Sequence, residues 1–168
     1  MNVPLVITFI MLGIAVLLSY MPIFKDVKKG GSDRYWMMAP KQRIMYYVMI
    51  PLAAIGMVAF IHHYATKKAT TGLLTRKYVL EILTALFLVA SALWSLTLVA
   101  YNKTSKKAYK IGCSASLVVA AIASILMLAG AYEDNNSPPY VRISILALCI
   151  TTVLNDAVGW NARFILHG

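Results

Sequence analysis

The stretch YVLEILTALFLVASALWSLTLVAY, residues 78–101, contains one charged residue, Glu81, which lies near its start. A helix needs about 20 largely apolar residues to cross a hydrocarbon core of roughly 30 Å. This stretch is long enough and apolar enough to do so. It therefore predicts a helix that spans a membrane.

Four further stretches of the chain have the same character, and together the five leave little sequence for a water-soluble domain. Hydrophobic residues make up 60% of the 168 residues, charged residues 13%, and the mean hydropathy is +0.71. The apolar runs are continuous rather than alternating, which disfavours a β-barrel. We expect an all-α, polytopic integral membrane protein, one domain over 1–168, with about five transmembrane helices at 3–24, 44–63, 78–101, 111–132 and 141–166.

The tyrosines support these boundaries. Nine of the ten fall at or near the end of a predicted segment, where a phenol can keep its ring in an apolar layer and its hydroxyl in water. We interpret them as interfacial anchors: Tyr20, Tyr46, Tyr47, Tyr64, Tyr78, Tyr101, Tyr109, Tyr132 and Tyr140.

The basic residues predict a topology. Eleven lie in the first and third loops and the C-terminal tail, and five lie on the opposite side. Because cytoplasmic loops carry the excess of Lys and Arg, we expect loops 1 and 3 and the C-terminus on the cytoplasmic-equivalent side, and Met1 on the other. The net charge of +10 also permits contact with nucleic acid, but no recognition motif is present. The lipid bilayer is the expected partner of these juxtamembrane charges.

A stripe of small residues marks the fourth segment, where they recur every four positions. Small residues let helix backbones approach closely in a membrane. The stripe predicts either a buried face of the bundle or a seam between identical chains. Its members are Gly112, Ser116, Ala120 and Ser124.

The last segment is the most polar, and it carries a carboxylate, Asp156, inside the apolar region. On an α-helix one stripe with a spacing of four runs along this segment, with Thr152 and Asp156 beside it. Its members are Ala147, Thr151, Asn155, Gly159 and Arg163. A central Asp costs about 2.5–3.5 kcal/mol on insertion scales, so it should face the bundle and find a partner. We consider Arg43, Lys103 and Lys110 as partners.

Two interpretations of Asp156 remain open. It is either a buried polar clamp that holds the last helix in register, or a proton or cation site. The clamp is favoured, because a transporter would be expected to carry a second central carboxylate or broken helices in corresponding halves.

No pattern in the sequence supports an enzyme or a cofactor. There is no carboxylate pair, nucleophile with a base, or phosphate-binding loop. The adjacent His62 and His63 point about 100° apart on a helix and cannot clamp one metal ion, so we expect interfacial solvation there. Cys113 and Cys149 are expected to be apolar fillers at different depths.

Two resemblances arise at the C-terminal segment. The run Leu154-Asn155-Asp156-Ala157-Val158-Gly159-Trp160-Asn161, which closes a small multi-pass chain with basic loops, resembles small inner-membrane or minor capsid proteins of large icosahedral double-stranded DNA viruses of the chlorovirus type. That resemblance implies a structural, non-enzymatic component of the virion inner membrane that links it to other membrane or capsid proteins.

The second resemblance is to the translocator, or tryptophan-rich sensory, family. It rests on five segments in 168 residues, with Pro139-Tyr140 opening the last segment and Leu154-Asn155 late in it. It implies a protein that binds or transports small molecules, with Asp156 as an intramembrane site. The ligand pocket of that family uses many tryptophans, and this chain has three.

Overall fold

The computed structural model describes residues 1–28, 40–76, 78–162 and 164, and within them every side chain except those of 26–28 and 40–47. Five long helical rods fill most of these ranges, and no strand is present in them. The helices are α1 (Val3–Lys28), α3 (Pro40–Thr66), α4 (Val79–Thr104), α5 (Lys107–Glu133) and α6 (Pro139–Ile150). A short 3₁₀ turn, η1 (Leu73–Thr75), precedes α4, and a π-helix, η2 (Thr151–Trp160), continues α6.

Each of the five rods contains a stretch that is long and apolar enough to cross a membrane. These stretches are Val3–Lys25, Val48–Thr66, Val79–Thr104, Lys107–Glu133 and Pro139–Trp160, where α6 and η2 together make the fifth. The prediction of an all-α bundle with about five membrane-spanning segments is confirmed. The helices run past the predicted bounds at most ends, because the backbone stays helical beyond the last apolar residue.

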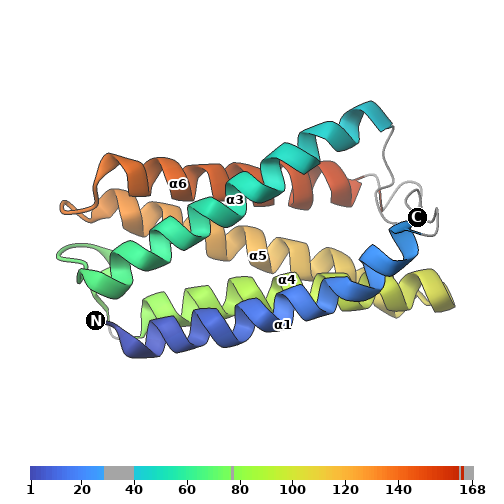
Figure 1. The fold of residues 1–168 in the computed structure, drawn as a ribbon, viewed down its shortest axis with the longest axis horizontal. Coiled ribbons are helices and arrows are strands. Elements are labelled where there is room, and N and C mark those ends of the chain that lie inside the picture. The colour runs from blue at the N-terminus through green and yellow to red at the C-terminus, as the bar shows by residue number, and fades with distance from the viewer. Residues whose placement is uncertain (29–39, 77, 163, 165–168) are drawn as a thin grey trace.

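The helices form a ring in which neighbours in space are not always neighbours in sequence. Helix α4 packs between α1 and α5, α5 also packs on α6, and α6 packs on α3. Helix α3 then returns to α1 through a smaller contact. Figure 1 shows α1 running alongside α4 and α3 crossing obliquely toward α6, with α5 between the two pairs.

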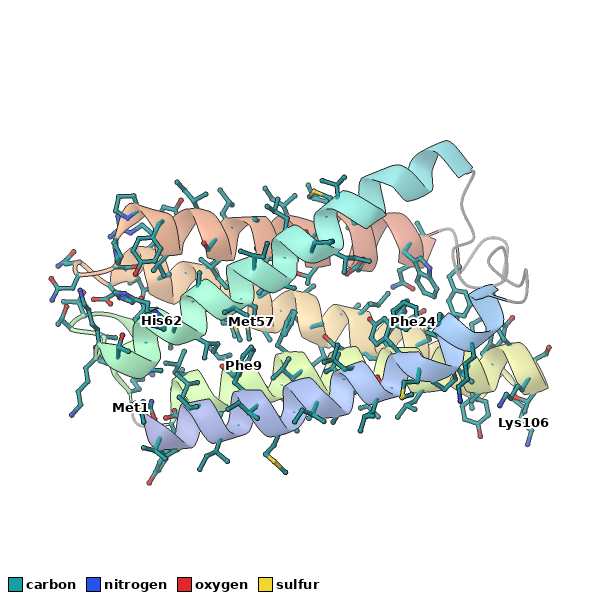
Figure 2. The ribbon with its side chains drawn as sticks, viewed as in Figure 1. Met1, Phe9, Phe24, Met57, His62 and Lys106 are labelled. Carbon is teal, nitrogen blue, oxygen red and sulfur yellow. The ribbon has the colours of Figure 1, made fainter. Side chains whose placement is uncertain are left out.

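The two ends of the bundle carry different connections. The first contains residue 1, the α3–α4 connection and the α5–α6 connection, and we call it the Asp134 end. The second contains the α4–α5 connection, and we call it the Lys106 end. Met1 and His62 lie at the first end and Phe24 and Lys106 at the second (Figure 2).

The interior is apolar at both ends. One buried cluster, which includes Met57, Phe60 and Phe87, joins α3, α4, α5 and α6. A second buried cluster, toward the Lys106 end, contains Leu98, Trp160 and Phe164. The rings of Trp160 and Phe164 are stacked, with their centroids 4.6 Å apart. Large apolar side chains also cover the outside of every helix, among them Ile7, Leu17, Ile55, Leu96, Ile143 and Leu154. An apolar exterior of this kind suits a lipid environment.

The α3–α6 contact is closest at Gly56. A Cβ atom built on Gly56 would overlap the backbone carbonyl oxygen of Ser144. Because glycine has no Cβ, the two backbones can meet there, as small residues allow in membrane bundles.

The π-helical end of the last rod corrects the stripe expected from a spacing of four. Thr151 and Asn155 are buried as that spacing requires, but the next buried residue is Trp160 and not Gly159, which is only partly buried. Hydrogen bonds in a π-helix span five residues, so each turn advances the buried face further along the chain than in an α-helix. Arg163, the last member of the expected stripe, lies outside the described residues.

Candidate functional site

The small-residue stripe of α5 lies inside the bundle. Ser116, Ala120 and Ser124 are buried, and Gly112 is partly buried. A Cβ atom on Gly112 would lie 3.3 Å from Cγ2 of Thr97, so this part of the stripe faces α4. The other end of the stripe faces η2, as the hydrogen bonds show.

Two pairs of hydroxyl groups join helices through the core. Oγ of Ser124 and Oγ1 of Thr152 lie 2.7 Å apart and connect α5 to η2. Oγ of Ser95 donates to Oγ of Ser19 at 2.6 Å and connects α4 to α1. All four side chains are buried, and such bonds satisfy polar groups that have no water to bind.

Asp156 lies in η2 and is partly buried, while its neighbour Asn155 is buried. Its carboxylate is close enough to Tyr20 of α1 to interact electrostatically with the phenol. Within the described ranges, no hydrogen bond or ion pair reaches this carboxylate from Lys103 or Lys110. The Lys110 ammonium instead lies 5.6 Å from the centre of the Phe164 ring. The side chain of Arg43, the third expected partner, is among those that the structure does not describe.

A second polar site, which the sequence did not reveal, is centred on Asp134 in the α5–α6 connection. This side chain has 0% of its surface exposed. Its Oδ1 accepts hydrogen bonds from the backbone N–H of Thr70 at 3.1 Å, from Oγ1 of Thr70 at 2.9 Å and from the N–H of Asn136 at 3.2 Å. Nη2 of Arg142 donates to the Asp134 backbone oxygen at 3.0 Å. The site therefore ties the α3–α4 connection to the start of α6.

Hydrogen bonding controls the charge state of this carboxyl. Burial raises the pKa of Asp134, but the bonds from Thr70 and Asn136 favour the ionised form more strongly, and the net effect is a lowered pKa. Asp134 is therefore a carboxylate at neutral pH. It acts as an acceptor for donors from two connections.

Glu133 strengthens the same junction from the adjacent position. Its Oε2 accepts from the backbone N–H of Leu73 at 2.8 Å, and its carbonyl oxygen accepts from Oγ1 of Thr71 at 2.6 Å. The connections at this end thus form one hydrogen-bonded unit.

Two residues near Asp134 correct the interfacial roles expected of them, solvation for His63 and anchoring with a wet hydroxyl for Tyr64. His63 is 2% exposed, with its Nδ1 3.4 Å from the hydroxyl of Tyr140, and Tyr64 is 3% exposed, with its ring against Phe60. The phenol of Tyr64 lies beside Asp134, Ser137 and Arg142. Both rings are buried because the two connections fold over the end of α3. His62, in contrast, is exposed.

Part of this site had a signal in the sequence. An Asp that accepts from the N–H two residues later forms an Asx turn, and Asp134-Asn-Asn136 followed by prolines is typical of one. The bond to Thr70 had no such signal, because 64 residues separate the partners.

The polar groups of the two sites make contacts with other parts of the same chain. In the described part of the chain, no three His, Cys, Asp or Glu side chains gather as a metal site would require. Cys113 and Cys149 are both buried free thiols. Comparison of the chain with family models, with curated proteins and with solved structures finds no match.

Proposed function

We propose that this chain is a non-enzymatic structural or assembly protein of a membrane, of the kind found in the inner membrane of a virion beneath its capsid shell. One observation carries the proposal. The buried polar groups at Ser19, Ser95, Ser124, Thr152 and Asp134 bind other parts of the same chain and hold helices or connections together. Hydrogen bonds of this kind keep the helices and connections in a fixed arrangement. The resemblance of residues 154–161 to viral inner-membrane proteins supports the virion setting.

In this proposed role, the basic loops orient the chain in the membrane and offer a surface to partner proteins. The excess of Lys and Arg in loops 1 and 3 supports an orientation with the Lys106 end on the cytoplasmic-equivalent side. Three lysines at that end, Lys103, Lys106 and Lys107, are exposed and can reach a neighbouring membrane or capsid protein.

Cross-linking in the native membrane tests this role. Amine-reactive cross-linkers should join Lys103, Lys106 or Lys107 to lysines of other proteins, and mass spectrometry identifies the linked peptides. Links confined to this chain would contradict an assembly role.

A second function, binding or transport of a small molecule or ion, is favoured by the environment of Asp156. Its carboxylate has no hydrogen-bond or ion-pair partner in the described part of the chain, and it interacts electrostatically with Tyr20 of α1. An intramembrane carboxylate without such a partner can exchange a proton or bind a cation.

Two variants at Asp156 separate the candidate functions. If Asp156 is structural, Asp156→Asn should keep the fold, because the amide preserves most of the hydrogen-bonding capacity. Asp156→Leu should lose about 1–3 kcal/mol of stability if the structural partner is Arg43, the expected partner whose side chain the structure does not describe, because that cation would lose its counter-charge. If it is a transport site, wild-type protein in liposomes should carry a proton or cation flux that a well-folded Asn variant lacks. Such a flux would replace the structural proposal with transport.

A further inference from the structure

A pocket opens at the Asp134 end between the start of α1, the end of α3 and the connection that leads into α4. Its volume is about 530 Å³. Small-molecule sites typically occupy roughly 300–1,000 Å³. The pocket therefore has room for a headgroup-sized ligand.

The rim of this pocket is positively charged. Lys67, Lys68 and Arg76 line it, and all three are exposed. No ion pair neutralises any of them among the residues that the structure describes. The one carboxylate in the lining, Glu81, accepts a hydrogen bond from Nδ2 of Asn2 at 2.8 Å. Three basic side chains and one acidic side chain thus line the pocket.

Two helices also begin at this pocket. Asn2 and Pro4 of the α1 start and Leu80 and Glu81 of the first turn of α4 are part of the lining. The N-terminus of a long helix carries a partial positive charge and N–H groups without intrahelical partners, which favour an anion. The last turn of α3, residues 64–66, also lines the pocket and carries the opposite partial charge, so the three helix ends together add one net positive end to the field of the basic side chains.

The backbone at the α4 start is held in an unfavourable conformation. Tyr78, which lines the pocket, has φ 65° and ψ 0°, the left-handed region that residues with a Cβ rarely adopt. Strain of this kind is concentrated at binding sites, where the surrounding structure maintains it.

The position of the pocket indicates which anion it takes. Its lining combines the charged rim with buried apolar side chains, Leu74 and Leu80, and with the buried ring of Tyr64. It lies where the membrane-spanning part of α3 ends at Thr66 and that of α4 begins at Val79, which is the depth of lipid headgroups. We propose that this pocket binds a phosphate ester, namely the headgroup of an anionic phospholipid.

The test uses the full chain in a mild neutral detergent and three probes. These are short-chain phosphatidylglycerol, short-chain phosphatidylcholine and inorganic phosphate, each titrated by calorimetry. The test variant replaces Lys67, Lys68 and Arg76 with Gln. The control replaces Lys103, Lys106 and Lys107 with Gln, which removes the same charge from the opposite end of the bundle.

Phosphatidylglycerol should bind the wild type and the control alike. The test variant should bind it about 100-fold more weakly, because each basic residue near an anionic lipid is worth roughly a fivefold factor. Glu81→Gln should bind it about fivefold more tightly, by the same factor. Phosphatidylcholine should bind no more than weakly, since its headgroup carries no net charge.

Inorganic phosphate separates the two sources of the phosphate group. If it binds as tightly as phosphatidylglycerol and is lost in the same variant, the site recognises a soluble phosphate and the lipid assignment is overturned. Phosphatidylglycerol binding that is unchanged in the test variant, or equally weakened in both triple variants, would show that the pocket is not a site.

Discussion

At the scale of single residues, Asp134 holds the Asp134 end together. A buried carboxylate needs hydrogen-bond donors to be stable, and three N–H or O–H groups from Thr70 and Asn136 meet its Oδ1. The sequence could predict the turn at Asp134-Asn-Asn136 from its local chemistry. It could not predict Thr70, because a contact across 64 residues depends on the packing of α3 against α6.

Replacement of Asp134 should lower stability in a pH-dependent way. Asp134→Ala removes a charged acceptor from three hydrogen bonds, although the exposed Thr70 can then donate to water, and we expect a loss of about 1–3 kcal/mol at pH 7. Because the pKa of Asp134 is lowered in the folded state, its contribution is complete above the unfolded pKa of about 3.9 and is lost as the pH falls through the folded pKa. Wild-type stability should therefore fall more steeply below about pH 4 than that of the variant.

Thermal unfolding in detergent at pH 7, 5 and 3 measures both effects. Asn135→Ala is the matched control, since that side chain is exposed and adjacent. If wild type and Asp134→Ala lost the same stability between pH 5 and pH 3, the carboxylate would not be the acid-sensitive group described here.

At the scale of elements, the fit between helices depends on small residues and on helix type. The apolar runs in the sequence located all five rods, and the stripe on α5 marked a face that is buried at Ser116, Ala120 and Ser124. The α-helical spacing placed Thr151 and Asn155 on the buried side but failed at Gly159, toward the end of the π-helix η2 that contains all three. Hydropathy carries no information on whether a hydrogen bond spans four residues or five.

The α3–α6 contact should be sensitive to one methyl group. Gly56→Ala would place a Cβ against the backbone carbonyl of Ser144, which cannot rotate away, so the helices must separate. Overpacking of this kind costs about 1–3 kcal/mol. Unfolding of the purified variant in detergent measures the loss.

Gly13 provides the control for this substitution. A Cβ at Gly13 meets nothing within 4 Å. Gly13→Ala should therefore be neutral, or stabilising by up to about 1 kcal/mol, because alanine loses less entropy than glycine in a helix. Equal effects of the two substitutions would contradict the close approach of α3 and α6.

At the scale of the whole molecule, the ring order α1–α4–α5–α6–α3 brings together segments that are distant in sequence. The number and class of the helices could be predicted, because each needs only length and apolar composition. The order could not, since lipid-facing and protein-facing sides of a membrane helix are similarly apolar and differ mainly in small and polar residues. The ring places the Asp134 cluster and the basic pocket at one end and Lys106 at the other.

The central claim is that the chain crosses a membrane five times, with its two ends on opposite faces. Single cysteines at Ser32, Lys68, Lys106 and Asn136, in a chain with Cys113 and Cys149 replaced by alanine, place one label in each connection between successive rods. A membrane-impermeant maleimide added to oriented vesicles should label positions 32 and 106 from one face and positions 68 and 136 from the other. Labelling of any two consecutive positions from the same face would contradict the five-span account.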